Sequence, residues 1–145
     1  MSKARELDED VLREYLLKET EIVQGIISRM ANTSFLIKGW SVTLIVASLL
    51  LERGVYHHFI AFVPWFVFWC LDAYFLCLER LYRKLYDWLI KNRLKTDEYL
   101  LDMNIDRFRK ELPCIIQTFF SKTLVLFYGL LLIIILVTVL INFCA

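Results

Sequence analysis

Apolar residues recur at helical spacing through residues 6–31, with acidic and basic residues between them. They are Leu12, Tyr15, Leu16, Ile22, Val23, Ile26, Ile27 and Met30. This spacing predicts an amphipathic helix, and the acids at positions 8–10 suit its first turns, where carboxylates favour the helix dipole. The sequence "ANTS" at 31–34 offers Asn32, Thr33 or Ser34 as an N-cap. We therefore expect one helix to end there and a second to begin.

Two long apolar runs follow. Residues 35–51 predict a first membrane span, short enough to draw on flanking residues or to bend the bilayer slightly. "ERGVYHH" (52–58) reads as a tight polar turn, and a second span is expected from about Tyr56 to Leu78. Because no helix breaker precedes "ERLYRKLYDWLIKNRLK", this second helix is expected to continue well beyond the membrane.

The last third of the chain predicts a polar stretch and then a final span. Residues 96–112 suggest one or two amphipathic turns with Thr96 and Asn104 as caps, and Pro113 suits the first turn of a last helix. A third span is expected from about Phe119 to Phe143. The 23 residues from Thr123 onward carry no charge, and about 20 apolar residues suffice to cross the hydrocarbon core.

Composition agrees with this pattern. The 145 residues are 59% hydrophobic, with only four glycines and two prolines, whereas soluble domains are nearer 45–50% apolar. We expect an all-α integral membrane protein with three transmembrane helices plus amphipathic cytoplasmic helices. The expected segments are a cytoplasmic amphipathic helix (1–34), a transmembrane hairpin of spans 1 and 2 (35–79), a cytoplasmic helical segment (80–118) and the third transmembrane helix (119–145).

The distribution of Lys and Arg predicts the topology. Residues 1–34 hold five, the turn at 52–58 holds one, residues 80–122 hold ten and residues 123–145 hold none. Positively charged flanks remain on the cytoplasmic side. The N-terminus is therefore expected inside and the C-terminus outside, and no signal-peptide pattern precedes the first apolar run.

Asp72 is the outstanding polar residue of the second span. Steps of seven residues along this helix give one stripe: Trp65, Asp72, Glu79, Tyr86 and Arg93. Asp72 lies seven residues before Glu79, which corresponds to about 10 Å below the expected cytoplasmic boundary. Lys38 lies close to the same boundary on the first span. The two therefore suggest an intramembrane ion pair.

Two alternatives to the simple pair remain open. Lys38 would snorkel to the headgroups while Asp72 is protonated or reaches local water, or Asp72 would serve as a gate or permeation element that faces a lumen. The pair and the gate overlap, because an ion pair that holds a bundle closed is also a gate.

The third span has a polar stripe of its own. It consists of Gln117, Ser121, Tyr128, Thr138 and Asn142, which share one face of a helical wheel. Such residues connect helices in lipid or line a water-filled path. Three helices from one chain cannot enclose a useful aqueous pore, so a lumen would need several copies.

Basic residues of the middle segment could contact lipid or a ligand. They are Arg80, Arg83, Lys84, Lys91, Arg93 and Lys95, with Arg107, Arg109 and Lys110 farther along. The positive-inside rule and anionic lipids account for them. In an oligomer they would also form a positive vestibule for a nucleotide or oligonucleotide, although interleaved acids weaken this idea for one copy.

Catalytic and metal motifs are not apparent. Arg53 and His58 have the R-x4-H spacing of some helical ribonucleases but lie in a short turn, and His57 and His58 lack acidic or cysteine companions. The four cysteines show no C-x-x-C motif and read as small apolar packers. We expect no enzyme, no cofactor and no metal site.

Two segments, "IISRMANTSFLIKGWSVTLIVASLL" and "LDAYFLCLERLYRKLYD", resemble small bacterial membrane proteins of anti-phage defence loci. These include effectors and accessories beside nucleotide-signalling and CRISPR systems, among them the membrane effector of Hailong-type systems. The resemblance implies an oligomeric inner-membrane protein, closed at rest, that opens or disrupts the membrane when infection is sensed and so arrests the cell. The resemblance does not assign a functional role to any residue of this chain.

The sequence thus leads to a homo-oligomeric pore or ion-channel effector of the bacterial inner membrane. The alternative is a non-conducting anchor or accessory subunit that recruits a soluble defence protein through its cytoplasmic helices. Expected partners are the lipid bilayer, further copies of the chain, and a nucleotide or oligonucleotide regulator or a soluble defence protein.

Overall fold

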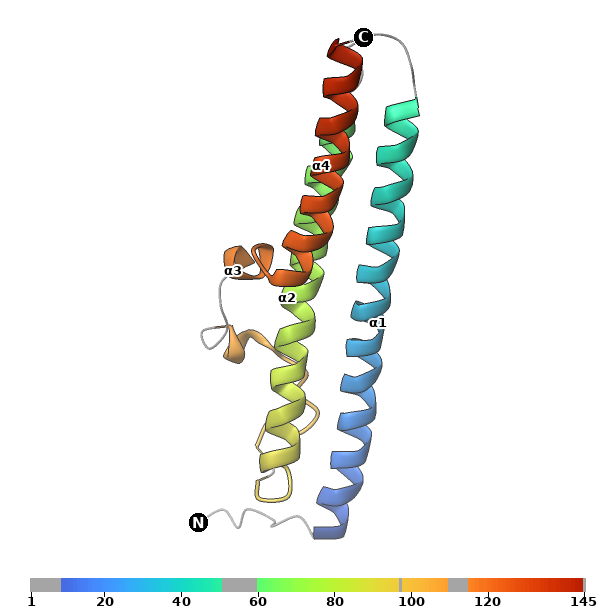
Figure 1. The fold of residues 1–145 in the computed structure, drawn as a ribbon. Coiled ribbons are helices and arrows are strands. Elements are labelled where there is room, and N and C mark those ends of the chain that lie inside the picture. Colours follow the sequence, from blue (N-terminus) through green and yellow to red (C-terminus); the bar gives the residue numbers. More distant parts are fainter. Residues whose placement is uncertain (1–8, 51–59, 97, 110–114, 145) are drawn as a thin grey trace. The chain divides into compact units, whose positions relative to one another are not determined.

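The chain is helical throughout its regular elements. The computed structural model describes residues 9–50, 60–96, 98–109 and 115–144, with side chains from Asp10 to Ile141. The helices are α1 (Glu9–Leu50), α2 (Phe62–Asn92), the 3-10 turn η2 (Asp106–Phe108), α3 (Ile115–Phe119) and α4 (Lys122–Cys144) (Figure 1). No strand occurs in these ranges, so the predicted all-helical class is confirmed. Three helices, α1, α2 and α4, are long and apolar enough to cross a membrane.

Helix α1 does not break at "ANTS". It runs through 31–34 as part of one helix of 42 residues, so the predicted N-cap and the separate N-terminal helix were wrong. An N-cap residue needs non-helical backbone angles, and no glycine or proline enforces them here. The Ser34 hydroxyl instead donates a hydrogen bond to the Asp72 carboxylate and accepts one from the Lys38 ammonium.

Helix α2 continues past Glu79 to Asn92, as its lack of a breaker predicted. Thr96 and Asn104 do not occupy the predicted cap positions, since the residue at the N-cap of η2 is Ile105, which makes no side-chain cap hydrogen bond. The Thr96 hydroxyl accepts a hydrogen bond from the Glu98 amide, and the Asn104 side chain accepts one from the Asp106 amide. Asn104 thereby supports the start of η2.

The last helix is interrupted, contrary to the expectation of one helix into the third span. Helix α3 ends at Phe119 and α4 begins at Lys122. The indole of Trp69 donates to the Phe119 carbonyl at 3.1 Å and its ring stacks on the Phe119 ring with centroids 4.3 Å apart. The side chain of Trp69 thus occupies a carbonyl that an unbroken helix would use, and the Ser121 amide closes a tight turn on Thr118. Pro113 lies outside the described residues.

The contacts divide the chain into two compact units. The paired-helix unit comprises Met1–Met30 and Leu78–Leu112, and the three-helix unit comprises Ala31–Cys77 and Pro113–Ala145.

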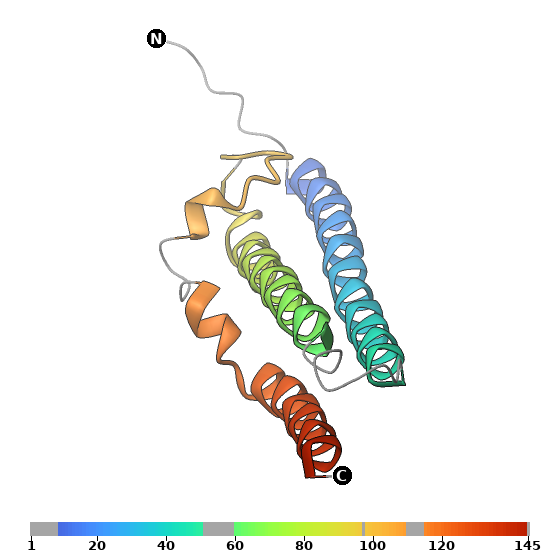
Figure 2. The same cartoon turned by 90° about the horizontal axis from the view of Figure 1, so that it is seen from above.

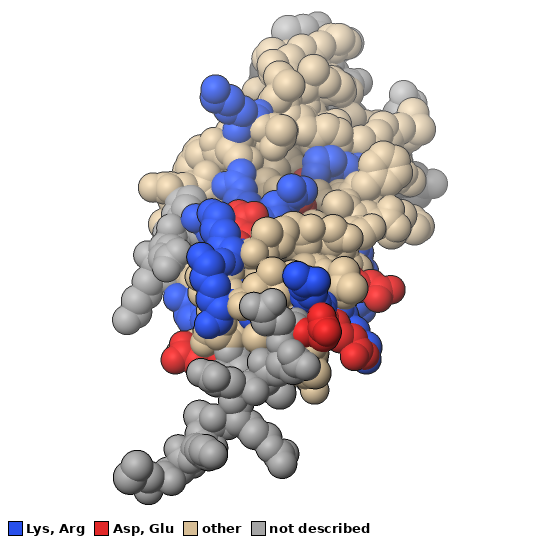
Figure 3. Space-filling model, turned by 90° about the horizontal axis from the view of Figure 1, so that it is seen from below, with Lys and Arg blue, Asp and Glu red and all other residues tan. Residues whose placement is uncertain are grey.

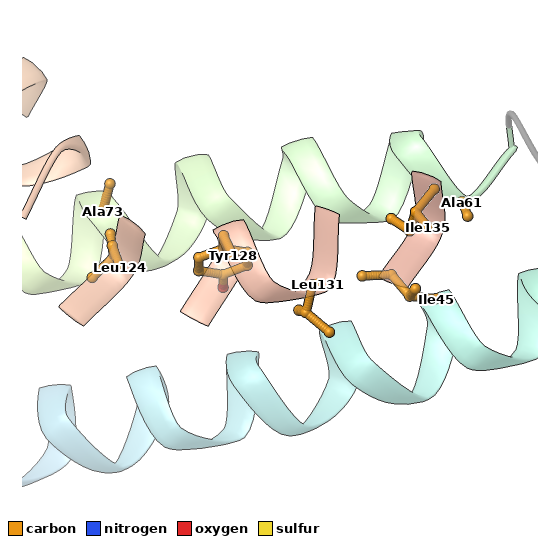
Figure 4. Packing of buried hydrophobic residues seen from close by; sticks show 7 residues of the cluster. All are labelled: Ile45, Ala61, Ala73, Leu124, Tyr128, Leu131 and Ile135. Atoms are coloured by element: carbon orange, nitrogen blue, oxygen red, sulfur yellow. The ribbon is translucent and has the colours of Figure 1, made fainter. Parts of the chain in front are cut away.

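In the three-helix unit, the later part of α1, the earlier part of α2 and α4 share a core. Figure 4 shows side chains from these segments meeting along α4: Ile45, Ala61, Ala73, Leu124, Tyr128, Leu131 and Ile135. The opposite side of α4 presents exposed Leu126, Ile133 and Ile141. Such an apolar outer surface suits lipid or further copies of the chain.

In the paired-helix unit, the first part of α1 lies beside the last part of α2, as both Figure 1 and Figure 2 show. The buried apolar residues are Leu12, Val23, Leu81, Leu85, Leu89 and Phe108. The three α2 leucines recur every four residues, so they form one stripe along the helix.

Candidate functional site

Asp72 is the centre of a buried polar network in the three-helix unit. Its side chain is fully buried. Lys38 Nζ lies 2.6 Å from Oδ2, and the Ser34 hydroxyl donates to Oδ1 at 2.5 Å. The Tyr128 hydroxyl has one hydrogen to donate, which it shares between Oδ2, at 3.3 Å, and the Phe68 carbonyl, at 3.1 Å. Residues of α1, α2 and α4 therefore meet at one carboxyl group.

Lys38 is held by this network. Its ammonium also donates to the Ser34 hydroxyl at 2.7 Å, and its side chain is only 26% exposed. The structure thus places Lys38 and Asp72 in contact, as the ion-pair hypothesis expected, and the ammonium does not snorkel away. Since the pair is closed within one chain, Asp72 faces neighbouring helices and not a cavity of this unit.

Aromatic side chains of α2 pack against Tyr128 and so support one side of the network. The Trp65 indole donates to the Tyr128 carbonyl at 2.8 Å, and the Trp69 ring stacks on the Tyr128 ring with centroids 5.8 Å apart. The two tryptophan rings also meet edge to face at 5.1 Å. Trp65 and Trp69 therefore pack between helices, whereas Trp40 is exposed as an interfacial residue would be.

Replacing Tyr128 with phenylalanine is expected to lower the free energy of unfolding by about 1–2 kcal/mol, the usual cost of losing a buried hydrogen bond. The ring stacking would remain, so the effect isolates the hydroxyl. Chemical denaturation in micelles, followed by circular dichroism, measures it. The exposed Tyr74 provides the matched control, and an equal loss in Tyr74→Phe would contradict the assignment.

The predicted stripe of the third span does not form one surface. Gln117 lies on α3 and is exposed, while Tyr128 is buried on α4. The break at residues 120–121 rotates α3 away from the register of α4, so spacing across it no longer predicts a shared face. Thr138 donates to the Ile134 carbonyl of its own helix, the Ser121 hydroxyl has no hydrogen-bond partner among the described residues, and the Asn142 side chain lies outside them.

Arg93 belongs to a second buried network, in the paired-helix unit. Its guanidinium and the Glu19 carboxylate form a bidentate pair at 2.5 and 2.9 Å, and both side chains are buried. Arg93 also donates to the carbonyls of Thr96, Glu98 and Tyr99. Glu19 in turn accepts from the Leu101 amide at 2.6 Å.

The prediction that Arg93 contacts lipid or a ligand was therefore wrong. The N–H groups of its guanidinium all donate to Glu19 or to backbone carbonyls, and one face lies over the Trp88 ring at 5.4 Å, because the chain folds back over the end of α2. The other stripe members remain on α2: Glu79 pairs with Arg83 at 2.8 Å, and the Tyr86 hydroxyl accepts from Gln24 at 2.9 Å.

Most of the remaining basic residues that the structure describes are exposed. Lys84, Lys91 and Lys95 are exposed and Arg80 is half-buried. Figure 3 shows Lys and Arg interleaved with Asp and Glu on the face in view. The Arg107 guanidinium instead lies over the rings of Trp88, Tyr99 and Phe108 at 4.4 to 4.9 Å, and no hydrogen-bond acceptor reaches it within the described segments.

Sequence reasoning missed Glu19 and misassigned Ser34. Glu19 lies seven residues after Leu12 and four before Val23, both of which are buried. An acid in register with an apolar stripe indicates a buried acid, and this pattern could have identified Glu19. Ser34 had no comparable signal, because only its distance to Asp72 distinguishes a bridging hydroxyl from a cap.

Several other candidate residues lie where the structure gives no description. Arg53, His57, His58, Cys114 and Lys110 lie outside the described residues, as does the side chain of Cys144. Cys70 and Cys77 are free thiols, and within the described ranges no group of three or more His, Cys, Asp or Glu residues could hold a metal ion.

Comparisons of this chain with protein-family models, curated proteins and solved structures find no match. The arguments for function therefore rest on the residues and their contacts.

Proposed function

We propose that this chain is a membrane effector that conducts ions or permeabilises the bilayer as a homo-oligomer and is held closed by the Ser34–Lys38–Asp72–Tyr128 network. The buried Asp72 carboxyl carries the proposal. An ionisable residue within a membrane span is costly and is usually retained for function. A chain that only needed to be anchored would gain more from an apolar residue at this position.

The network has the features of a lock. It joins three helices through one carboxyl group, so loss of any charged partner leaves the other buried without compensation. Two arrangements of the helices, one with the pair closed and one with it hydrated, would then differ by a few kcal/mol. The lumen would form between copies, for which the exposed apolar faces of α1 and α4 offer surface.

The biological setting follows the resemblance described above. We place the protein in the bacterial inner membrane with the N-terminus cytoplasmic and the C-terminus periplasmic, and we propose that opening depolarises the host cell in anti-phage defence. The paired-helix unit would form the cytoplasmic layer that receives the trigger, such as a nucleotide, an oligonucleotide or a soluble defence protein.

A non-conducting anchor or accessory subunit is the second candidate. One observation favours it: Ser34 and Lys38 of α1 and Tyr128 of α4 all contact Asp72 of α2, so the network would serve equally to hold three helices together. In this case the paired-helix unit would recruit a soluble defence protein.

Induced expression with a membrane-potential dye, combined with the particle mass of the purified chain, separates the candidates. The effector should be an oligomer and should abolish most of the dye signal on phage challenge, with a protonophore as the positive control. A monomer that leaves the potential unchanged under challenge would exclude the pore, and co-purification of a soluble protein would then favour the anchor.

A further inference from the structure

The paired-helix unit contains a polar hollow of about 370 Å³. Gln24 and Ile27 of α1 line one wall, and Arg83, Tyr86 and Asp87 of α2 line the other. It therefore combines a base, an acid, a phenol, an amide and one aliphatic side chain. The buried networks of Asp72 and Arg93 use none of these five side chains.

Some hydrogen-bonding groups that line this cleft are available to a ligand. Gln24 donates to the Tyr86 hydroxyl, which leaves the hydrogen of that hydroxyl to be donated. Arg83 uses Nε and Nη2 on Glu79, which leaves Nη1. Asp87 is exposed and forms no ion pair within the described part of the chain. The cleft thus presents the free Nη1 of Arg83 one helical turn before the Asp87 carboxylate, with the Tyr86 hydroxyl on the residue next to Asp87.

The order of these groups along α2 matters. The apolar part of α2 ends near Glu79, and at 1.5 Å per residue Arg83 lies about 6 Å beyond it and Asp87 about 12 Å. A headgroup layer is roughly 5–8 Å deep on each side of the hydrocarbon core, so Arg83 falls within it and Asp87 on its aqueous side. In a bilayer that α2 crosses, the base therefore lies nearer the hydrocarbon and the acid nearer the water.

We propose that this cleft binds the phosphoethanolamine headgroup of a phospholipid, with the phosphate on Arg83 and Tyr86 and the ammonium on Asp87. The phosphate of such a lipid is bonded to glycerol and the ammonium follows it, which is the same order as the base and the acid. Ile27 supplies an apolar contact for the ethanolamine carbons. The proposal rests on α2 crossing a membrane and is independent of conduction.

Other common headgroups fit less well. Phosphatidylglycerol carries no cation, so Asp87 would face a net anion without compensation. Phosphatidylcholine carries a cation but has no N–H to donate, and charge-assisted hydrogen bonds are the stronger kind. The cleft should therefore prefer phosphatidylethanolamine to both.

Native mass spectrometry of the full-length chain tests this preference. The purified protein is exchanged into micelles that contain equal amounts of the three phospholipids with matched acyl chains. Wild-type protein should retain phosphatidylethanolamine roughly tenfold over the others, the size expected for one charge-assisted hydrogen bond. Asp87→Asn should reduce this ratio to within about twofold, and Asp87→Lys should shift the preference to phosphatidylglycerol.

Two exposed neighbours outside the cleft serve as matched controls. Lys84→Gln and Glu21→Gln should keep the wild-type ratio, because both residues are exposed and neither lines the cleft. Retention of the three lipids in equal amounts by wild type would overturn the proposal. A preference that survives Asp87→Asn, or equal retention of phosphatidylcholine and phosphatidylethanolamine, would also overturn it.

Discussion

Replacing Arg93 with methionine is expected to lower the free energy of unfolding of the paired-helix unit by about 3–5 kcal/mol. The substitution leaves the Glu19 carboxylate buried without its cation. It also removes the donors to the carbonyls of Thr96, Glu98 and Tyr99. Few single substitutions cost this much.

The backbone around the turn adds to this effect. Tyr99 and Leu101 have φ values of 57° and 56°, a left-handed conformation that costs a non-glycine residue roughly 1–2 kcal/mol. Arg93 holds the Tyr99 carbonyl and Glu19 holds the Leu101 amide. Once these bonds are lost, the turn is expected to open.

Denaturation in micelles measures the global loss, and hydrogen exchange at the Leu101 amide measures the local one. Lys91→Met, an exposed base on the last turn of α2, is the matched control and should change stability by less than about 0.5 kcal/mol. Equal effects of the two substitutions, or an unchanged exchange rate at Leu101, would show that the pair does not hold the turn.

Removing either charge of the Lys38–Asp72 pair should produce the second large loss of stability. Asp72→Asn and Lys38→Met are each expected to destabilise the three-helix unit by about 3–5 kcal/mol, because either one leaves a buried charge without its counter-ion. The double variant should recover much of the loss, since two neutral side chains in a buried position are tolerated better than one charge. The double variant should then lose no more than either single variant, so the coupling energy from this cycle should be about 3 kcal/mol or more.

The exposed pair of Glu14 and Lys18 is a matched control. Its atoms are 3.0 Å apart, but its side chains are 69% and 64% exposed. Its coupling energy is expected to be about 0.5 kcal/mol or less. A Lys38–Asp72 coupling as small as this would remove the basis for a lock.

The same variants distinguish a lock from a permeation element. If the pair locks the bundle, Asp72→Asn and Lys38→Met should each raise the resting ion leak of cells that express the chain. If Asp72 instead lined a lumen, Asp72→Asn would leave the resting potential unchanged and reduce the ion flux after the trigger. Membrane-potential dye signals before and after phage challenge separate these outcomes.

Local sequence signals predicted some features and failed at others. The unbroken α2 and the Lys38–Asp72 contact both followed from local information, namely the absence of breakers and the similar depths of two charges. The break before α4 did not, because it depends on the Trp69 indole, which is distant in sequence from the Phe119 carbonyl it binds. The continuity of α1 was likewise missed, because Ser34 is engaged by Asp72 across 38 residues.

The sequence by itself determined the all-helical class, the three helices long enough to cross a membrane and the unusual position of Asp72. Hydrophobic periodicity and run length are properties of the chain alone. Only the tertiary structure decided which polar side chains meet. It buried Arg93 against Glu19, assigned Ser34 to Asp72 and left Arg83 and Asp87 open in a cleft, because hydrogen-bond partners on different helices are selected by packing and not by spacing along one of them.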